Sequence, residues 1–172
     1  MTTDTPYISY FLILIPFLLL VFIAAAKKKK GSPDSLVYEV VGSVLSPAEI
    51  SFYKVLQSIL TDEAIVLSKM RVADVMLPVT SDKSLWQVSF NKISRKHFDF
   101  VICKSTDMSV IAVVELNDKS HNKKNRQDRD EFLQQACDSA ALPIVFIQAS
   151  RTYKPAELVS EMSKNISQEY FR

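Results

Sequence analysis

The segment FDFVICK at residues 98–104, followed by STDM at 105–108 and SVIAVVEL at 109–116, decides the fold. Both outer runs are rich in β-branched and aromatic residues, which favour strands. The four residues between them have the length of a hairpin connection, so the two strands should pair antiparallel. One carboxylate interrupts each apolar run, Asp99 in the first and Glu115 in the second. The hairpin therefore predicts both the centre of a sheet and a candidate site.

Helical and extended patterns alternate on both sides of this hairpin. The sequence Ser46-Pro47-Ala48-Glu49 is a capping box that begins a helix, and the run PIVFIQA is typical of a strand buried on both faces. The expected elements are a helix at 47–60, a strand at 64–70, a helix at 84–93, the two hairpin strands, a helix at 126–141, a strand at 143–149 and a helix from 155 to about 167. This order predicts an α/β domain.

An uncharged apolar run, YISYFLILIPFLLLVFIAAA, occupies residues 7–26. A helix of about 20 residues spans the ~30 Å core of a bilayer, so the run predicts one transmembrane helix in contact with lipid. Four lysines follow at 27–30 and no Lys or Arg precedes the run. This charge distribution predicts that the N-terminus lies outside an inner (plasma) membrane and that the rest of the chain lies in the cytoplasm. A cleaved signal peptide would instead have its positive charges before the apolar run. We expect an anchor at 1–26, a basic and polar linker at 27–44 and a domain at 45–172.

The charge balance limits the choice of partner. The chain has 21 Lys and Arg against 19 Asp and Glu, and four of the lysines lie together at 27–30, so the domain itself is close to neutral. This argues against binding of nucleic acid through a broad basic surface and leaves a local positive groove open. The two cysteines, Cys103 and Cys137, have no metal-binding or disulfide spacing and are expected to be buried thiols in a reducing compartment.

Asp99 and Glu115 are expected to form a metal site. A carboxylate inside an apolar strand is costly to bury unless it is paired, hydrogen-bonded or bound to a cation. Mg²⁺ is usually bound by one or two carboxylates together with waters and substrate phosphates, and Mn²⁺ suits the same oxygen ligands. Strand alternation puts Asn117 on the same side as Glu115, so its amide oxygen is a third candidate ligand.

More polar residues follow the second hairpin strand. His121 is one of two histidines in the chain, and a neutral imidazole near a metal-bound water can act as a general base. Arg126, Arg129 and Asp130 open the next helix, where the arginines can contact a phosphate or pair with the carboxylates. The alternative for each of these charges is a solvated surface. Asp74 is a further carboxylate that either joins the cluster or caps a turn.

Six segments, taken in order, resemble the domain-of-unknown-function family numbered 2726: LSPAEISFYKVL, KMRVADVML, HFDFVIC, VVELNDKSH, RDEFLQQA and LPIVFI. That family in turn resembles the very-short-patch-repair type of the PD-(D/E)XK endonuclease superfamily. The resemblance covers residues 45–153 and implies a restriction-endonuclease-like core of helix, three strands, helix and strand. The positions that match the superfamily's site residues are the metal-binding carboxylates Asp99 and Glu115, the accessory acid Glu49, the histidine His121, and the pair Arg129 and Asp130.

The resemblance implies a nuclease that hydrolyses phosphodiesters with Mg²⁺, and the apolar run at 7–26 predicts that it is anchored to the membrane. The lysine that the superfamily usually has two residues after the glutamate is absent; relatives of this branch tend to have an aspartate there, and this chain has Asn117. Asparagine keeps an oxygen ligand but loses the charge. A nuclease fold that binds nucleic acid or a protein partner without catalysis therefore stays an alternative. A tethered scaffold whose charged cluster only stabilises the fold is a second one.

Overall fold

The computed structural model describes residues 17–20, 37–117 and 123–172. Among these residues, none of the helices combines the length and the apolar composition that a bilayer crossing needs. The expected transmembrane segment at 7–26 lies outside the described residues except for 17–20, which are helical. Gly42–Arg172 forms a compact unit of its own, and this unit contains the sheet.

The elements follow the order predicted from the sequence, with one short α-helix and one short 3₁₀ segment added. They are α2 (Pro47–Ile59), β1 (Ala64–Arg71), α3 (Val72–Val75), α4 (Lys83–Ile93), β2 (His97–Lys104), β3 (Val110–Asn117), α5 (Lys123–Ser139), β4 (Ile144–Gln148), α6 (Pro155–Met162) and the 3₁₀ turn η1 (Gln168–Tyr170). The mixed α/β class is therefore confirmed, and α3 is the helix that the sequence pattern did not indicate.

The four strands form one mixed sheet in the order β1-β2-β3-β4. β2 pairs antiparallel with both β1 and β3, whereas β3 and β4 are parallel. The predicted hairpin is present, with Phe100 opposite Val114 at one end of its ladder and Cys103 opposite Val110 at the other. The connection from β3 to the parallel β4 runs through α5, because a parallel pair needs a crossover.

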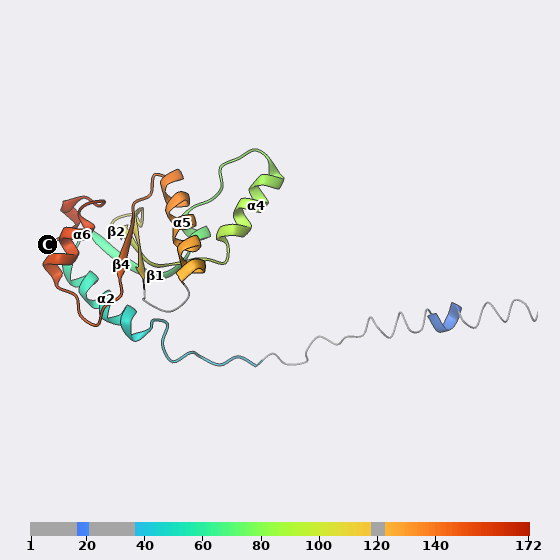
Figure 1. The fold of residues 1–172 in the computed structure, drawn as a ribbon, viewed down its shortest axis with the longest axis horizontal. Coiled ribbons are helices and arrows are strands. Elements are labelled where there is room, and N and C mark those ends of the chain that lie inside the picture. The colour runs from blue at the N-terminus through green and yellow to red at the C-terminus, as the bar shows by residue number, and fades with distance from the viewer. Residues whose placement is uncertain (1–16, 21–36, 118–122) are drawn as a thin grey trace, which may run out of the picture. The chain divides into compact units, whose positions relative to one another are not determined.

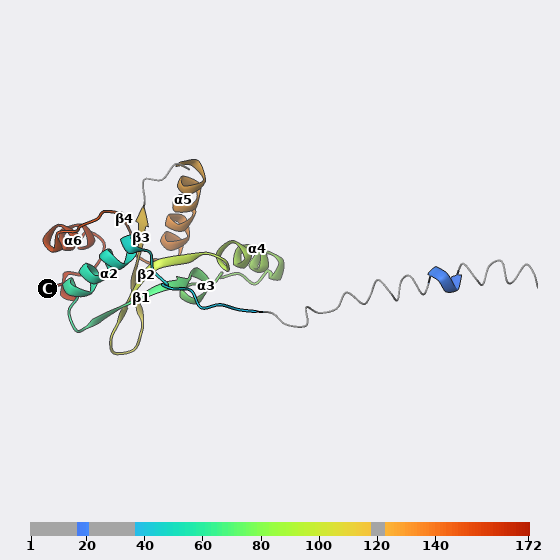
Figure 2. The same cartoon turned by 90° about the horizontal axis from the view of Figure 1, so that it is seen from below.

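Helices cover both faces of the sheet. In Figure 1 and Figure 2, α2 and α6 lie on one face and α5 lies on the other. Phe52 of α2 and Phe100 of β2 are fully buried in the core on the first face. Leu133 and Cys137 of α5 are buried with Val113 of β3 in the core on the second. Because both faces are covered, the hairpin strands are nearly continuous apolar runs, and both cysteines are buried thiols as predicted.

The last helix ends earlier than the sequence indicated. α6 stops at Met162 instead of continuing to about residue 167. Ile166 and Phe171 are both buried, and the backbone N–H of Arg172 donates to the Ile59 carbonyl at 2.9 Å. A straight helix would carry these residues away from the core, so the burial of the chain's end is what ends α6.

Candidate functional site

Asp99 and Glu115 meet where the β2–β3 ladder ends. The last paired residues are Phe100 and Val114, and the adjacent residue of each strand carries a carboxylate. The Asp99 N–H donates to Glu115 Oε1 at 3.1 Å, and the Leu116 N–H donates to Asp99 Oδ2 at 3.0 Å. Each carboxylate thus accepts a backbone N–H of the facing strand just beyond the last paired residues. The two strands can end their pairing here without leaving these N–H groups unsatisfied.

Glu115 is the one polar or charged residue that is buried among the described residues, with 1% of its surface exposed. Burial, and after it the negative charge of Asp99, raise the pKa of Glu115 to about 7, while the Arg129 guanidinium opposes the shift. Arg129 Nη2 donates to Glu115 Oε2 at 3.3 Å and to Asp130 Oδ1 at 3.1 Å. A carboxyl group with a pKa near neutral can release its proton to a binding cation or exchange it in acid–base chemistry.

Lys69 of β1 adds a positive charge that the sequence analysis did not single out. Its Nζ lies 2.8 Å from Asp99 Oδ1 and 2.5 Å from Glu49 Oε1. The β1–β2 register pairs Ser68 with Phe100 and Met70 with Phe98, so the neighbouring residues of Lys69 pair with those of Asp99. Partial burial alone would lower the pKa of Lys69, but the hydrogen bonds to Asp99 and Glu49 outweigh it and raise the pKa above its usual value. The lysine therefore stays charged and joins the two carboxylates.

The backbone of Lys69 is left-handed, with φ at 56° inside a strand. This conformation costs a non-glycine residue about 1–2 kcal/mol, and residues held in it are concentrated at functional sites. The regular pairing of β1 with β2 skips Lys69 and resumes on either side of it. The strain thus occurs at the residue whose side chain reaches both carboxylates.

Glu49 joins the cluster through Lys69 and is fixed by the predicted capping box. The Ser46 N–H donates to Glu49 Oε2 at 2.7 Å, and the Glu49 N–H donates to Ser46 Oγ at 3.4 Å. Burial would raise the pKa of Glu49, but the hydrogen bonds from Lys69 and Ser46 lower it overall. The same carboxylate therefore caps α2 with one oxygen and binds Lys69 with the other.

Asn117 ends β3 and has a buried amide oxygen, Oδ1, with no hydrogen-bond partner among the described residues. An unpaired buried acceptor costs about 1–3 kcal/mol, so this oxygen is suited to bind a ligand. Together with the unused lone pairs of Asp99 and Glu115, it gives oxygen donors that fit Mg²⁺ or Mn²⁺, with waters completing the shell. The described part of the chain has no group of three or more His, Cys, Asp or Glu residues that could hold a metal ion. A cation here would therefore depend on two carboxylates and the amide oxygen.

The other residues that the sequence suggested for the site either are not described by the structure or do not contact Asp99 and Glu115. His121 lies outside the described residues, and so does the side chain of Arg126, although this residue belongs to α5. Asp130 contacts Arg129 and not the metal-site carboxylates. Asp74 does not join the cluster, because it is exposed and pairs with Arg71 at 2.5 Å.

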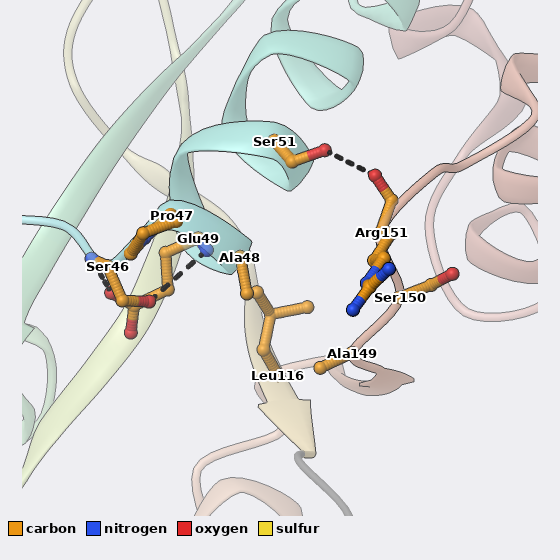
Figure 3. Close-up of a pocket in the computed structure, with 9 residues that line it drawn as sticks. All are labelled: Ser46, Pro47, Ala48, Glu49, Ser51, Leu116, Ala149, Ser150 and Arg151. Carbon is orange, nitrogen blue, oxygen red and sulfur yellow. Dashed lines mark hydrogen bonds between the residues drawn. The ribbon is translucent and has the colours of Figure 1, made fainter.

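A cavity of about 600 Å³ adjoins the cluster on the α2 side of the sheet, as Figure 3 shows. Its volume is in the range of small-molecule and substrate sites. The lining residues are Ser46, Pro47, Ala48, Glu49 and Ser51 from the start of α2, Leu116 from β3, and Ala149, Ser150 and Arg151 from the segment after β4. Ser51 Oγ donates to the Arg151 carbonyl at 3.2 Å and so links two walls. Arg151 was not indicated by the sequence, because its place beside α2 depends on the parallel pairing of β4 with β3.

The comparisons identify a family but no activity. A family model described as Protein of unknown function (DUF2726) matches residues 41–166. The matched region contains all four strands and the carboxylate cluster. No curated protein and no solved structure matches the chain.

Proposed function

The chain belongs to the family described as Protein of unknown function (DUF2726), and from this premise we propose that it is a metal-dependent nuclease of the PD-(D/E)XK kind that hydrolyses nucleic acid phosphodiesters. The observation that carries the proposal is the convergence of Asp99 and Glu115. They lie on neighbouring strands, at the point where the ladder ends, and each accepts a backbone hydrogen bond from the other strand. Burial of a carboxyl group as deep as that of Glu115 is costly, and a bound cation would offset this cost.

The residues that would hold Mg²⁺ or Mn²⁺ are Asp99, Glu115 and Asn117. When bound, such a cation polarises a phosphate and lowers the pKa of a bound water. Glu115 has to be ionised to act as a ligand, and with a pKa of about 7 it can lose its proton to a binding cation near neutral pH. Arg129 is 43% exposed and touches Glu115 from the solvent side, so its other N–H groups can contact a substrate phosphate. His121 is the proposed general base on sequence grounds alone.

The test is cleavage of labelled DNA and RNA oligonucleotides by the full-length chain, kept in detergent, with and without Mg²⁺. Glu115→Ala should abolish Mg²⁺-dependent cleavage, because it removes the deepest proposed ligand. Glu63→Ala is a matched control, since Glu63 is an exposed glutamate that directly precedes β1 and lies outside the cluster. Cleavage by the Glu115→Ala protein at the rate of the control would reject the assignment.

A second candidate is a nuclease-like fold that binds nucleic acid, or a protein partner, without cleaving it. The neutral amide of Asn117, where the resemblance expects a charged side chain, favours it. In this case binding of an oligonucleotide survives Glu115→Ala and does not depend on Mg²⁺. Fluorescence anisotropy of the two proteins, with Mg²⁺ or with a chelator, distinguishes this candidate from the nuclease.

The membrane anchor is a separate proposal that depends on the sequence. The uncharged run at 7–26 and the lysines at 27–30 support one crossing, with the domain on the cytoplasmic side. The chain should stay with membranes after alkaline carbonate extraction, and removal of residues 1–30 should release it. Extraction of the intact chain by carbonate would contradict the anchor.

A further inference from the structure

Lys69 and the proposed metal ion would both bind the carboxylate of Asp99. Asp99 has two oxygens, of which Oδ2 accepts the Leu116 N–H at 3.0 Å and Oδ1 accepts Lys69 Nζ at 2.8 Å. Each oxygen therefore already has a donor. A cation that binds Asp99 must share an oxygen with one of these donors.

The two donors differ in how easily a metal ion could displace them from Asp99. The Leu116 N–H belongs to the backbone of β3, which is paired with β4 at this residue, and cannot move without disturbing the sheet. The ammonium of Lys69 ends a flexible stem, and its side chain is 31% exposed. Lys69 also repels a second cation at Asp99 by like charge, whereas an N–H group carries no net charge. The lysine is therefore the donor that a metal displaces.

Glu49 offers the displaced lysine a second partner. Its Oε1 lies 2.5 Å from Lys69 Nζ, and its Oε2 is held by the Ser46 N–H. The capping box thus fixes this carboxylate beside Asp99 whether or not the lysine leaves Asp99. Lys69 can keep one ion pair when it gives up the other.

We propose that Lys69 competes with the divalent cation for Asp99 and thereby sets the metal affinity of the site. This inference rests on the proposed metal site at Asp99 and Glu115. The left-handed backbone of Lys69 supports it, because strain is retained at the residue that brings the competing charge. The same ammonium would hold the Asp99 carboxylate in place until a metal arrives.

The test is calorimetric titration of the full-length chain in detergent with Mn²⁺. Lys69→Met removes the competing charge and keeps a side chain of similar length, and Lys54→Met is a matched control on the exposed side of α2. A hydrogen bond to a charged group corresponds to a factor of about ten to a hundred in affinity, so Lys69→Met should bind Mn²⁺ at least about tenfold more tightly. The control should bind like the original chain, and Glu115→Ala should abolish binding in both backgrounds.

The outcomes separate this inference from the proposed function. If the original chain binds Mn²⁺ and Lys69→Met binds it equally or more weakly, the competition is wrong and the metal site stands. If no variant binds Mn²⁺, both are wrong. Should Lys69→Met fail to fold, Lys69→Gln keeps a neutral hydrogen-bond donor and gives the same test. A further readout is thermal: Mn²⁺ should raise the melting temperature of the Lys69 variant by more than that of the original chain.

Discussion

Replacement of Glu115 by glutamine should make the protein more stable at alkaline pH. In the folded protein the pKa of Glu115 is raised to about 7 from its ordinary value of 4.5. Stability that depends on the protonated carboxyl is therefore fully present below pH 4.5 and is lost as the pH rises through about 7. Glutamine resembles the protonated form, because it has a donor group and an acceptor oxygen and carries no charge. The variant should not show this loss.

The size of the effect follows from the pKa. The shift corresponds to about 3 kcal/mol once Glu115 is fully ionised, and at 1% exposure the side chain has little solvent screening. For a domain of this size, about 3 kcal/mol is a difference of roughly 10 °C in melting temperature. Thermal denaturation followed by circular dichroism should show Glu115→Gln melting higher at about pH 8, with the difference falling close to zero at about pH 4.

The same experiment also tests the alternative that the protein is a scaffold whose charged cluster only stabilises the fold. If the cluster only stabilised the fold, the ionised Glu115 would be held by Arg129, and its loss would lower the melting temperature at pH 8. The reasoning would be refuted if the Glu115→Gln protein melted at a lower temperature than the original chain at about pH 8. A difference in melting temperature that stayed the same at every pH would refute it as well. Glu63→Gln is the control, because it removes the charge of an exposed glutamate that lies outside the cluster.

Two further substitutions test the contacts around the cluster. Arg129→Ala should raise the pKa of Glu115 above 7, because the guanidinium lowers it; a lower pKa in NMR titration of the glutamate side chain would contradict this assignment. Ser46→Ala should cost about 1 kcal/mol in urea denaturation, because it removes the side-chain cap of α2. A loss indistinguishable from zero would mean that the Glu49 carboxylate caps the helix alone.

The parts of the fold that depend on local chemistry could be predicted from the sequence. The capping box lies within four consecutive residues, so Ser46 and Glu49 were sufficient to locate the start of α2. The hairpin fixed the pairing of β2 with β3, and with it the approach of Asp99 to Glu115. The end of α6 could not be predicted, because it depends on the burial of Phe171 against residues about a hundred positions earlier in the chain.

The candidate site was only partly predictable for the same reason. Lys69 lies in a polar interruption of β1, but strand alternation gives no sign of a left-handed residue, since such residues are rare outside glycine. Its two partners come from α2 and β2, and their meeting is a tertiary event. Arg151 reaches the cavity only because β4 lies beside β3. A sequence pattern indicates which residues are unusual, whereas the contacts between distant elements decide which of them act together.

Three local costs occur near the end of the β2–β3 ladder: the left-handed backbone of Lys69, the buried carboxyl of Glu115 and the Asn117 side-chain oxygen, which has no partner among the described residues. Each is of the order of 1–3 kcal/mol, and a domain of ordinary stability has only about 5–15 kcal/mol in total. If these costs were incidental, substitutions that remove them would be free of consequence and would stabilise the fold. A cation bound to the same oxygens would instead offset two of them, because it would neutralise Glu115 and give the Asn117 oxygen a partner. The concentration of these costs around Asp99 is thus the physical argument that supports the proposed cation site.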